Sequence, residues 1–166
     1  VERLGQLVGD LRKLAELEER PLETLPVNLD ELLAEVVESV ASQPAYQGRS
    51  VQVVISKVPW PLPKITGDRD LLWLVFYNLI DNALKYTGPE NTVDVRALED
   101  GQSVIVEVAD NGPGIPPEDL DRIFDELYRG KNARGTEGSG LGLALAQRIV
   151  QRHNGSISVR SRTTEE

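Results

Sequence analysis

The chain has 166 residues, which fits one domain with a short appendage at roughly 100 to 200 residues per domain. Hydrophobic residues make up 40% of it and charged residues 27%, as in ordinary soluble globular proteins and unlike disordered or fibrous ones. The formal net charge of -9 argues against nucleic acid as a partner, because binding a phosphate backbone needs clustered lysine and arginine.

Cysteine is absent, and His153 is the only histidine. These facts exclude disulfide frameworks, thiolate nucleophiles and metal sites built from sulfur or from two imidazoles. The longest apolar run, Leu71 to Tyr77, is far shorter than the ~20 residues of a membrane-spanning helix, so we expect no membrane contact by this chain. Without an initiating Met or a signal-peptide pattern, the chain is expected to be a piece of a longer protein.

The first helix is expected from Val1 to about Glu19. Its leucines follow the 3-4-3 spacing of a coiled-coil seam: Leu4, Leu7, Leu11 and Leu14. Two interpretations stay open, an amphipathic helix that packs on its own domain and the end of a dimerising helix. Pro21 and Pro26 break the helix, so we place a domain boundary there, with residues 1–26 as helix end and linker and residues 27–166 as the main domain.

The main domain mixes helical and strand patterns. Asn28 is suited to cap a helix that starts at Leu29 and ends before Gly48. Helical spacing predicts two further helices, from about Asp70 to Tyr86 and from about Leu141 to Arg152. Strands are expected at Val51 to Val58, Val93 to Leu98, Ser103 to Ala109 and Ser156 to Arg160. This order predicts an α/β two-layer sandwich.

Four polar side chains share one face of the helix expected at residues 70–86. They fall within an arc of roughly 100° on a helical wheel: Asn78, Asp81, Asn82 and Lys85. A solvated polar face is the ordinary explanation of such a stripe. Two amides four residues apart are, however, mediocre helix formers. Amide oxygens beside one ammonium also suit a magnesium phosphate, because Mg²⁺ takes oxygen ligands and shares substrate phosphates.

A second candidate segment runs from Asp110 to Pro116 (DNGPGIP), directly after an expected strand. Asn-Gly after a strand is typical of a hairpin turn. The residues that follow show no strand alternation, which favours another interpretation. A carboxylate at a strand end, followed by glycines that let a ligand approach the backbone, can hold a hydrogen-bonding heterocycle.

A third candidate is the glycine-rich segment Gly138 to Leu143 (GSGLGL), at the start of the last helix. Glycines at a helix N-terminus present free N–H groups and the positive end of the helix dipole, which together bind phosphate. The segment is not the dinucleotide fingerprint, because Leu143 stands at the third glycine position and no strand precedes it. A P-loop is also excluded, because Asn132 follows the only Gly-Lys pair.

Between residues 112 and 142 lie seven of the fourteen glycines of the chain. The same interval carries four basic residues: Arg122, Arg129, Lys131 and Arg134. Long segments of this composition are usually lids or disordered loops.

Four segments, in order, carry a family resemblance: Asn78 to Thr87 (NLIDNALKYT), Asp110 to Ile115 (DNGPGI), Ile123 to Arg129 (IFDELYR) and Gly138 to Leu143 (GSGLGL). They look like the N, first glycine, F and second glycine boxes of the ATP-binding domain of bacterial sensor histidine kinases. The resemblance covers roughly residues 27–162, and the leucine-spaced start resembles the end of the second helix of the kinase's dimerisation domain.

The resemblance implies the Bergerat-type fold shared with gyrase, chaperone and mismatch-repair ATPases. In that fold a mixed, mainly antiparallel sheet and three main helices form a two-layer sandwich, and ATP lies under a mobile lid. By position, Asn82 would ligate Mg²⁺ with Asn78 beside it, and Lys85 and Tyr86 would face the phosphates and the nucleotide. Asp110 would accept the adenine amino group.

The other boxes imply further nucleotide contacts. Gly112 and Gly114 would let the purine approach, and Arg129 with Lys131 would reach the terminal phosphate. The second glycine box would give the lid its hinge and its phosphate-binding backbone. The remaining residues of the expected site are Ile115, Tyr128, Gly138, Ser139, Gly140, Leu141 and Gly142.

Two departures from the family pattern matter. The phospho-acceptor box, a His followed by an acidic residue, is absent, because Asn154 follows His153 and this His stands where the family has a structural one. The chain also stops at Glu166, before the last strand that such domains usually have, which would leave a sheet edge unpaired.

The sequence therefore predicts the catalytic domain of a two-component sensor histidine kinase, with ATP and Mg²⁺ as cofactors. The full enzyme, expected to be a homodimer, would move the γ-phosphoryl group to a His on the dimerisation domain, from which an Asp of a response regulator takes it. We expect a cytoplasmic location, whether the parent protein is soluble or anchored in the inner membrane.

Two alternatives come from other classes. A nucleotide-sensing module would bind without transferring phosphate, but every expected ligand position holds the expected residue type. An ATP hydrolase of the gyrase or chaperone kind would carry Glu at position 78 as a general base, whereas Asn78 cannot abstract a proton.

Overall fold

A computed structural model describes residues 2–57, 59–133, 136 and 138–163. The chain forms two compact units, which we call the sheet unit (Leu22–Gly112) and the terminal unit (Val1–Pro21 with Pro113–Glu166). Val58, at the end of an expected strand, and Arg134, one of the expected lid cations, lie outside the described residues. The division into a helix end and a catalytic domain after residue 26 remains a prediction.

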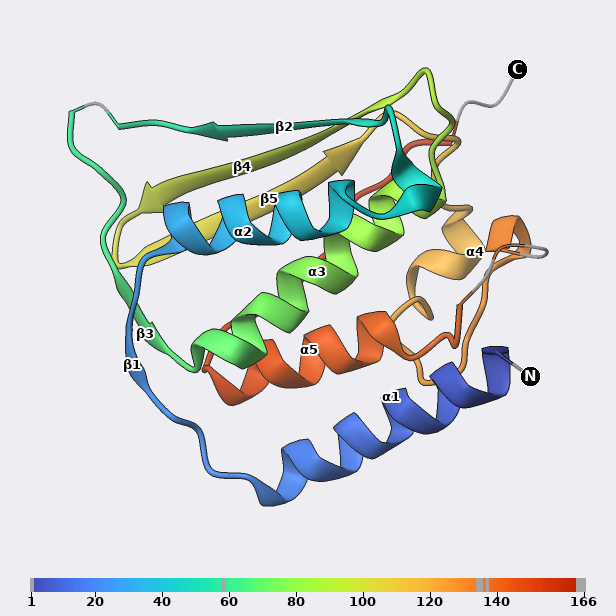
Figure 1. Cartoon of the computed structure of the whole chain (residues 1–166), viewed down its shortest axis with the longest axis horizontal. Helices are drawn as coiled ribbons and strands as arrows, with labels where there is room; N and C mark the ends of the chain where they lie inside the picture. Colours follow the sequence, from blue (N-terminus) through green and yellow to red (C-terminus); the bar gives the residue numbers. More distant parts are fainter. Residues whose placement is uncertain (1, 58, 134–135, 137, 164–166) are drawn as a thin grey trace. The chain divides into compact units, whose positions relative to one another are not determined.

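A mixed three-stranded sheet and two helices build the sheet unit (Figure 1). The strands follow the order β2 (Ser50–Ile55), β4 (Thr92–Asp100), β5 (Ser103–Asp110). β2 pairs with β4 in parallel, and β4 pairs with β5 in antiparallel register. The helices α2 (Leu29–Ala41) and α3 (Arg69–Lys85) lie on the same face of this sheet. A short antiparallel pair, β1 (Leu25–Val27) with β3 (Ile65–Gly67), completes the unit.

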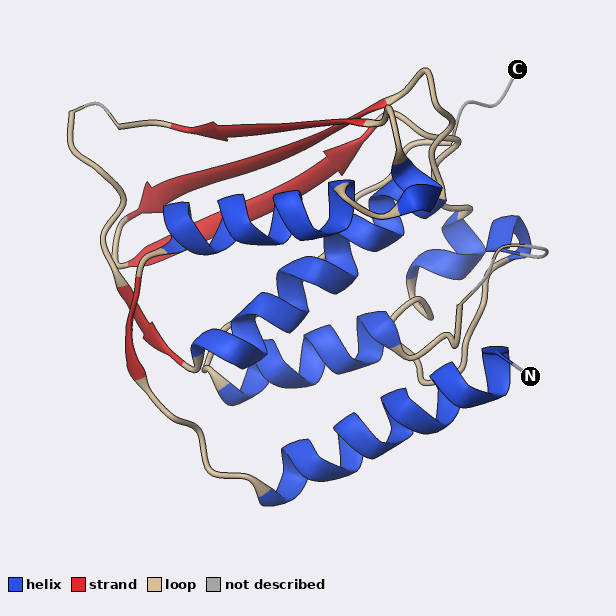
Figure 2. Cartoon of the chain, in the orientation of Figure 1, coloured by secondary structure: helices blue, strands red, loops and turns tan. Residues whose placement is uncertain are grey.

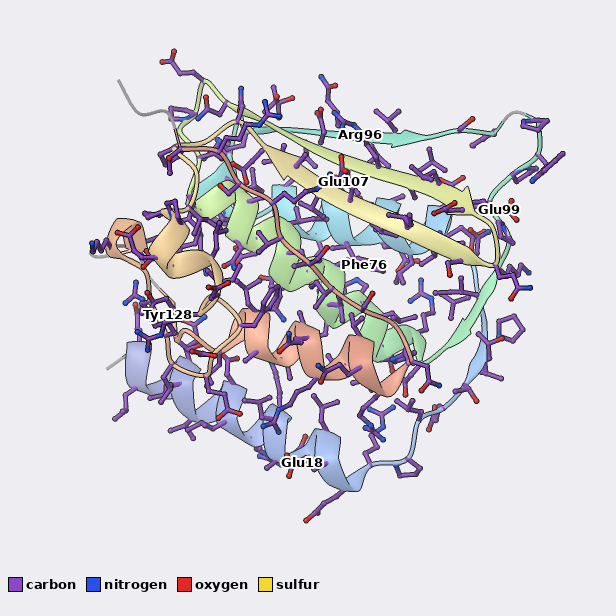
Figure 3. The ribbon with its side chains drawn as sticks, turned by 180° about the vertical axis from the view of Figure 1, so that it is seen from behind. Glu18, Phe76, Arg96, Glu99, Glu107 and Tyr128 are labelled. Carbon is purple, nitrogen blue, oxygen red and sulfur yellow. The ribbon has the colours of Figure 1, made fainter. Side chains whose placement is uncertain are left out.

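Apolar side chains from both layers fill the space between sheet and helices. Leu32 and Val36 of α2, Ile80 of α3 and Val93 and Val95 of β4 are all fully buried. Burying each such side chain stabilises the fold by about 1.5–3 kcal/mol. On the other face of the sheet, Arg96 pairs with Glu107 across β4 and β5, as Figure 3 shows.

Polar caps set where the two helices of the sheet unit begin. The Asn28 side chain accepts a hydrogen bond from the N–H of Glu31 at the start of α2. The Asp68 carboxylate, 1% exposed, does the same for Leu71 at the start of α3, and its other oxygen accepts the N–H of Glu23. Asp68 therefore fixes α3 and ties the segment before β1 to it.

Helices dominate the terminal unit (Figure 2). It contains α1 (Glu2–Glu19), the single turn α4 (Pro117–Leu120), a 3-10 turn (Lys131–Ala133) and α5 (Gly142–Arg152). α1 packs against α5, with Leu14 and Leu17 buried. One face of α1 thus packs within its own chain, and both interpretations, a helix that packs on its own domain and the end of a dimerising helix, remain predictions. No helix in the described part of the chain has the length and apolar character needed to cross a membrane.

The structure differs from the predicted elements in four places. β2 ends at Ile55, and the helix starting at Leu29 ends at Ala41, followed by a separate 3-10 turn, Pro44–Tyr46. The pair β1 and β3 was not expected, since each strand has only three residues. No strand is assigned at residues 156–160, although exposure there alternates with period two, as in an extended chain.

Candidate nucleotide-binding site

The polar stripe of α3 presents amide oxygens. Asn78 donates its Nδ2 to the carbonyl of Leu74 at 3.0 Å, so its Oδ1 faces away from the helix backbone. Asn82 lies one turn further along and is half-buried. Within the described residues its side chain makes no hydrogen bond, which leaves its amide oxygen available to a ligand.

Asp81 and Lys85 of the same stripe bind each other. The Lys85 Nζ lies 2.8 Å from Asp81 Oδ2, and both side chains are mostly buried. Asp81 Oδ1 accepts a hydrogen bond from the hydroxyl of Tyr46 at 2.7 Å. Asp81 is therefore an internal anchor and not an open ligand, whereas Lys85 keeps two of its three N–H donors for other acceptors.

A magnesium ion at this place depends on the amide of Asn82 and on a nucleotide. Among the described residues, no group of three or more His, Asp or Glu side chains could hold a metal ion by itself. An amide oxygen on a half-buried helix face, with a second amide oxygen of Asn78 beside it, fits Mg²⁺ that keeps waters and shares phosphate oxygens. The residues present therefore fit the expected ion.

Asp110 ends β5 with an oriented carboxylate. Its Oδ1 accepts the N–H of Gly112 at 2.9 Å, which leaves Oδ2 as a free acceptor direction on an exposed residue. Gly112 also lies close to the end of α3: a Cβ there would come within 3.0 Å of the Tyr86 carbonyl and the Thr87 methyl. The absence of a side chain at Gly112 thus lets the backbone that follows Asp110 pack against Tyr86 and Thr87.

Gly114 and Ile115 contact the C-terminal segment in the terminal unit. Gly114 has φ +80°, and a Cβ there would lie 2.3 Å from the Arg162 carbonyl oxygen. The N–H of Ile115 donates to the Ser161 hydroxyl at 2.7 Å. The structure therefore gives Gly114 a packing role, and the expected approach of a purine remains a prediction.

Asp119 anchors the F box from within residues 112–142, the segment expected to form the lid, which we call the lid segment. This carboxylate is 3% exposed and accepts the Tyr128 hydroxyl at 2.6 Å and the N–H of Lys131 at 3.1 Å. The hydrogen bond from Tyr128 lowers the pKa of Asp119, and the same bond raises the pKa of Tyr128. The guanidinium of Arg122 lies 4.2 Å from the centre of the Tyr128 ring. Tyr128, labelled in Figure 3, is thus held on two sides.

The two cations expected at the terminal phosphate are engaged within the terminal unit. Arg129 donates to the carbonyls of Ala133, at 2.7 Å, and Thr136. Lys131 forms an ion pair with Glu118 at 2.9 Å, which raises the pKa of Lys131. Either cation would have to share or exchange these partners to reach a phosphate.

The second glycine box leads into α5. Gly140 has φ +78°, a conformation that favours glycine, and its carbonyl accepts the N–H of Leu127. The Ser139 hydroxyl binds the Asp10 carboxylate at 2.5 Å and also accepts the N–H of Leu141. α5 begins at Gly142 without a side-chain cap, so its first N–H groups can face an anion.

The expected residues thus fall into two groups, one in each unit. The sheet unit carries Asn78, Asn82, Lys85, Tyr86, Asp110 and Gly112. The terminal unit carries Gly114, Ile115, Tyr128, Arg129, Lys131, Gly138, Ser139, Gly140, Leu141 and Gly142. Sequence patterns gave no signal for Tyr46 or Asp119, because both act through contacts with residues outside their own local motif.

Comparison with known proteins shows which family this chain belongs to. Residues 67–166 match the family described as histidine kinase-, DNA gyrase B-, and HSP90-like ATPase. The chain is 40% identical over 134 residues to the adaptive-response sensory kinase SasA of Gloeothece citriformis, covering 80% of this chain and 33% of that protein. It is 32% identical over 160 residues to the histidine-protein kinase/phosphatase MprB of Mycolicibacterium smegmatis, covering 96% of this chain and 31% of that protein.

Solved structures of sensor kinases share the fold. The mycobacterial sensor histidine kinase MprB matches with a TM-score of 0.69 and 30% identity, over 78% of this chain and 82% of that one. Full-length ShkA in complex with AMPPNP matches with a TM-score of 0.75 and 28% identity, over 93% of this chain and 33% of that one. The chain spans about a third of the length of the curated relatives. The resemblance to sensor kinases and the Bergerat-type α/β fold are therefore confirmed, and the chain belongs to the family of histidine kinase-, DNA gyrase B- and HSP90-like ATPases, as the ATP-binding catalytic domain of a sensor histidine kinase.

Proposed function

We propose that this chain binds Mg-ATP through the residues named above and presents the γ-phosphoryl group to a His on a dimerisation domain outside the chain. A response regulator would then take the phosphoryl group on an Asp, and the parent protein would act as a cytoplasmic or membrane-anchored homodimer. The single observation that carries the proposal is the stripe of α3, which brings two amide oxygens and one ammonium onto one face of a helix that buries Leu72, Val75 and Ile80.

Each residue has a role in positioning. Asn82, with Asn78 beside it, would hold Mg²⁺, which when bound supplies charge neutralisation at the phosphates. Lys85 would donate N–H bonds to phosphate oxygens from the last turn of α3. The free Oδ2 of Asp110 would accept the adenine amino group. Such phosphoryl transfer depends mainly on positioning and charge neutralisation, so no residue here has to act as a base.

The state of His153 supports an acceptor outside the chain. Its Nδ1 lies 2.7 Å from the carbonyl of Ile149, one turn earlier in α5, and the residue follows the last turn of that helix. This contact makes His153 a structural residue at the end of α5, which is the role that the family resemblance implied.

The test is transfer of label from γ-labelled ATP. We expect acid-labile label on a separately purified dimerisation domain of the parent protein when it is mixed with this chain, and no label on this chain alone. The variant Asn82→Ala should lower the transfer rate, whereas His153→Gln should leave it close to that of the wild type. Label on the chain alone that disappears in His153→Gln would overturn the proposal, and so would an acceptor that stays unlabelled.

A further inference from the structure

The loop between α2 and β2, residues 42–49, is bound at three points to the second half of α3 and to Thr87, just after this helix. Gln43 donates its Nε2 to the Tyr77 hydroxyl at 2.7 Å. Tyr46 donates its hydroxyl to Asp81. Arg49 donates to the carbonyl and to the hydroxyl of Thr87, at 2.9 and 2.5 Å. None of these three loop residues lies in a box that the sequence analysis singled out.

The middle contact continues into the candidate site. The hydroxyl of Tyr46 binds Asp81 Oδ1 at 2.7 Å, and Asp81 Oδ2 binds the Lys85 ammonium at 2.8 Å. Tyr46 is 6% exposed and Asp81 is 9% exposed, so this chain of bonds is shielded from water. One bond to each carboxylate oxygen fixes the rotamer of Asp81. Asp81 in turn fixes the ammonium at the end of the long and flexible Lys85 side chain.

The hydroxyl of Tyr46 stays a donor over the whole physiological pH range. Burial and the neighbouring carboxylate of Asp81 raise the pKa of Tyr46 far above its ordinary value. A neutral phenol therefore always offers its proton to Asp81 and leaves the charge of the carboxylate for Lys85.

We propose that Tyr46 and Asp81 are positioning residues that hold the ammonium of Lys85 in place for the phosphates of ATP. The inference rests on the proposed role of Lys85 in nucleotide binding. A free lysine loses much rotamer freedom when it binds a phosphate, whereas a lysine already held by Asp81 loses less. One N–H of Lys85 serves Asp81, and the other two remain for phosphate oxygens.

The experiment is a double-mutant cycle read by calorimetry. Tyr46→Phe removes only the hydroxyl that binds Asp81, and it is measured with Lys85 present and in the Lys85→Ala background. The matched control is Tyr77→Phe, which removes the neighbouring loop-to-α3 bond and keeps the ring that stacks on Trp73. The ligands are Mg-ATP and adenosine, which has the base but no phosphate.

We expect Tyr46→Phe to weaken Mg-ATP binding by roughly threefold to tenfold, the scale of one lost hydrogen bond, and to leave adenosine binding unchanged. Tyr77→Phe should change neither, and in the Lys85→Ala background Tyr46→Phe should have no further effect. If Tyr46→Phe fails to fold by circular dichroism, Asp81→Asn takes its place in the same cycle. That variant keeps an acceptor for Tyr46 and removes the charge that holds Lys85.

Three results would overturn the inference, and they differ in whether they also contradict the proposed role of Lys85 in nucleotide binding. An equal loss for adenosine, or an equal loss in the Lys85→Ala background, would show that Tyr46 acts on the fold and not through Lys85. Unchanged ATP binding in Tyr46→Phe, with weaker binding in Lys85→Ala, would reject the positioning role but leave the proposed function standing. Unchanged ATP binding in Lys85→Ala would show that Lys85 does not bind the phosphates, which contradicts its proposed role as well.

Discussion

Asn82 offers the amide oxygen on which a magnesium ion in this protein would depend, since no acidic cluster in the described residues could replace it. We expect Asn82→Ala to weaken Mg-ATP binding by roughly tenfold or more, the scale of one contact to a charged group, and to change metal-free ATP binding much less. Titrations of wild type and variant, each with Mg²⁺ and with a chelator, test this. Curves that shift equally in both conditions would reject the metal assignment.

The carboxylate of Asp110 leads us to expect selectivity for adenine. The N–H of Gly112 binds Oδ1, so Oδ2 is the oxygen that can accept a hydrogen bond from the adenine amine. With guanine, Oδ2 would face a keto oxygen, which is also an acceptor. Losing or inverting such a bond costs about 1–3 kcal/mol, so ATP should be preferred over GTP by roughly tenfold or more.

The variant Asp110→Asn sharpens this prediction of selectivity. Gly112 still requires an acceptor at the first position, which places the new Nδ2 donor where Oδ2 was. A donor there repels the adenine amine and can bind a guanine keto oxygen. We expect the preference for ATP to shrink or to invert, and a preference that stays unchanged in calorimetry would count against Asp110 as the residue that recognises adenine.

The buried carboxylate of Asp119 predicts a pH dependence. Its pKa is lowered first by the hydroxyl of Tyr128 and also by the cations of Lys131 and Arg122, while Glu118, whose own pKa is lowered by Lys131, is the carboxylate beside it. A lowered pKa in the folded state stabilises the fold above the ordinary pKa of Asp, about 3.9, and this stabilisation disappears as the pH falls through the folded value. Asp119→Asn should therefore be less stable than the wild type from about pH 5 to 8. In acid the two should converge, and a stability difference that persists in denaturant titrations at acid pH would contradict the ionic role of Asp119.

Sequence patterns single out the proposed ligands of this site but not the residues that contact them. The four boxes single out Asn78, Asn82 and Asp110, because each stands in a local motif. Tyr46 and Asp81 are 35 residues apart in the chain, and only the fold of the α2–β2 loop brings them together. The pattern on α3 likewise puts Asp81 and Lys85 on one face, four residues apart, where opposite charges can pair, but it gives no sign that Tyr46 binds the same carboxylate.

At the scale of elements, the capped and periodic segments are the predictable ones. α2 begins at Leu29, the residue after the expected cap Asn28, and α3 lies within a residue of its expected bounds. β1 and β3 escape prediction because each has three residues, and the strands contain a proline and a glycine. Their pairing and the contact of Asp68 with Glu23 are set by tertiary structure.

The end of α1 depends on another helix. α1 has no basic residue in its last turn, and Arg152 of α5 donates to the carbonyls of Leu17 and Arg20 there. The last carbonyls of a helix have no partner within the helix, so this arginine acts as an external cap.

We expect Arg152→Ala to destabilise the fold by about 1–2 kcal/mol, since it removes hydrogen bonds from a charged donor. Hydrogen exchange in the last turn of α1 should also become faster. Arg148→Ala is the matched control from the same helix, because it loses only the exposed ion pairs with Glu18 and Glu126. Exposed pairs contribute about 0–1 kcal/mol, so equal losses of stability in the two variants, measured by denaturant unfolding, would contradict the capping role.

At the scale of the whole molecule, nucleotide is expected to stabilise a chain whose proposed ligands are divided between two units. ATP that binds only the folded state adds about 2.7 kcal/mol of stability at a concentration 100-fold above its Kd. The described part of the segment between Gly114 and Gly140 has a single buried apolar residue, Ala133, so few apolar contacts oppose its local opening. Polar contacts of Arg129 with the Ala133 carbonyl and of Lys131 with Glu118 help to order this segment instead. A bound phosphate can replace these contacts.

We therefore predict that Mg-ATP slows hydrogen exchange most in this segment and at the start of α5, and raises the melting temperature. Both effects should be smaller with GTP, if Asp110 recognises the base, and smaller with Asn82→Ala at the same nucleotide concentration. Slower exchange spread evenly over α2, β4 and the lid segment would indicate only global stabilisation by mass action. Exchange that stays unchanged between Gly114 and Gly140 at saturating Mg-ATP would show that this segment does not close on the nucleotide, and the F box and second glycine box would then have no part in binding.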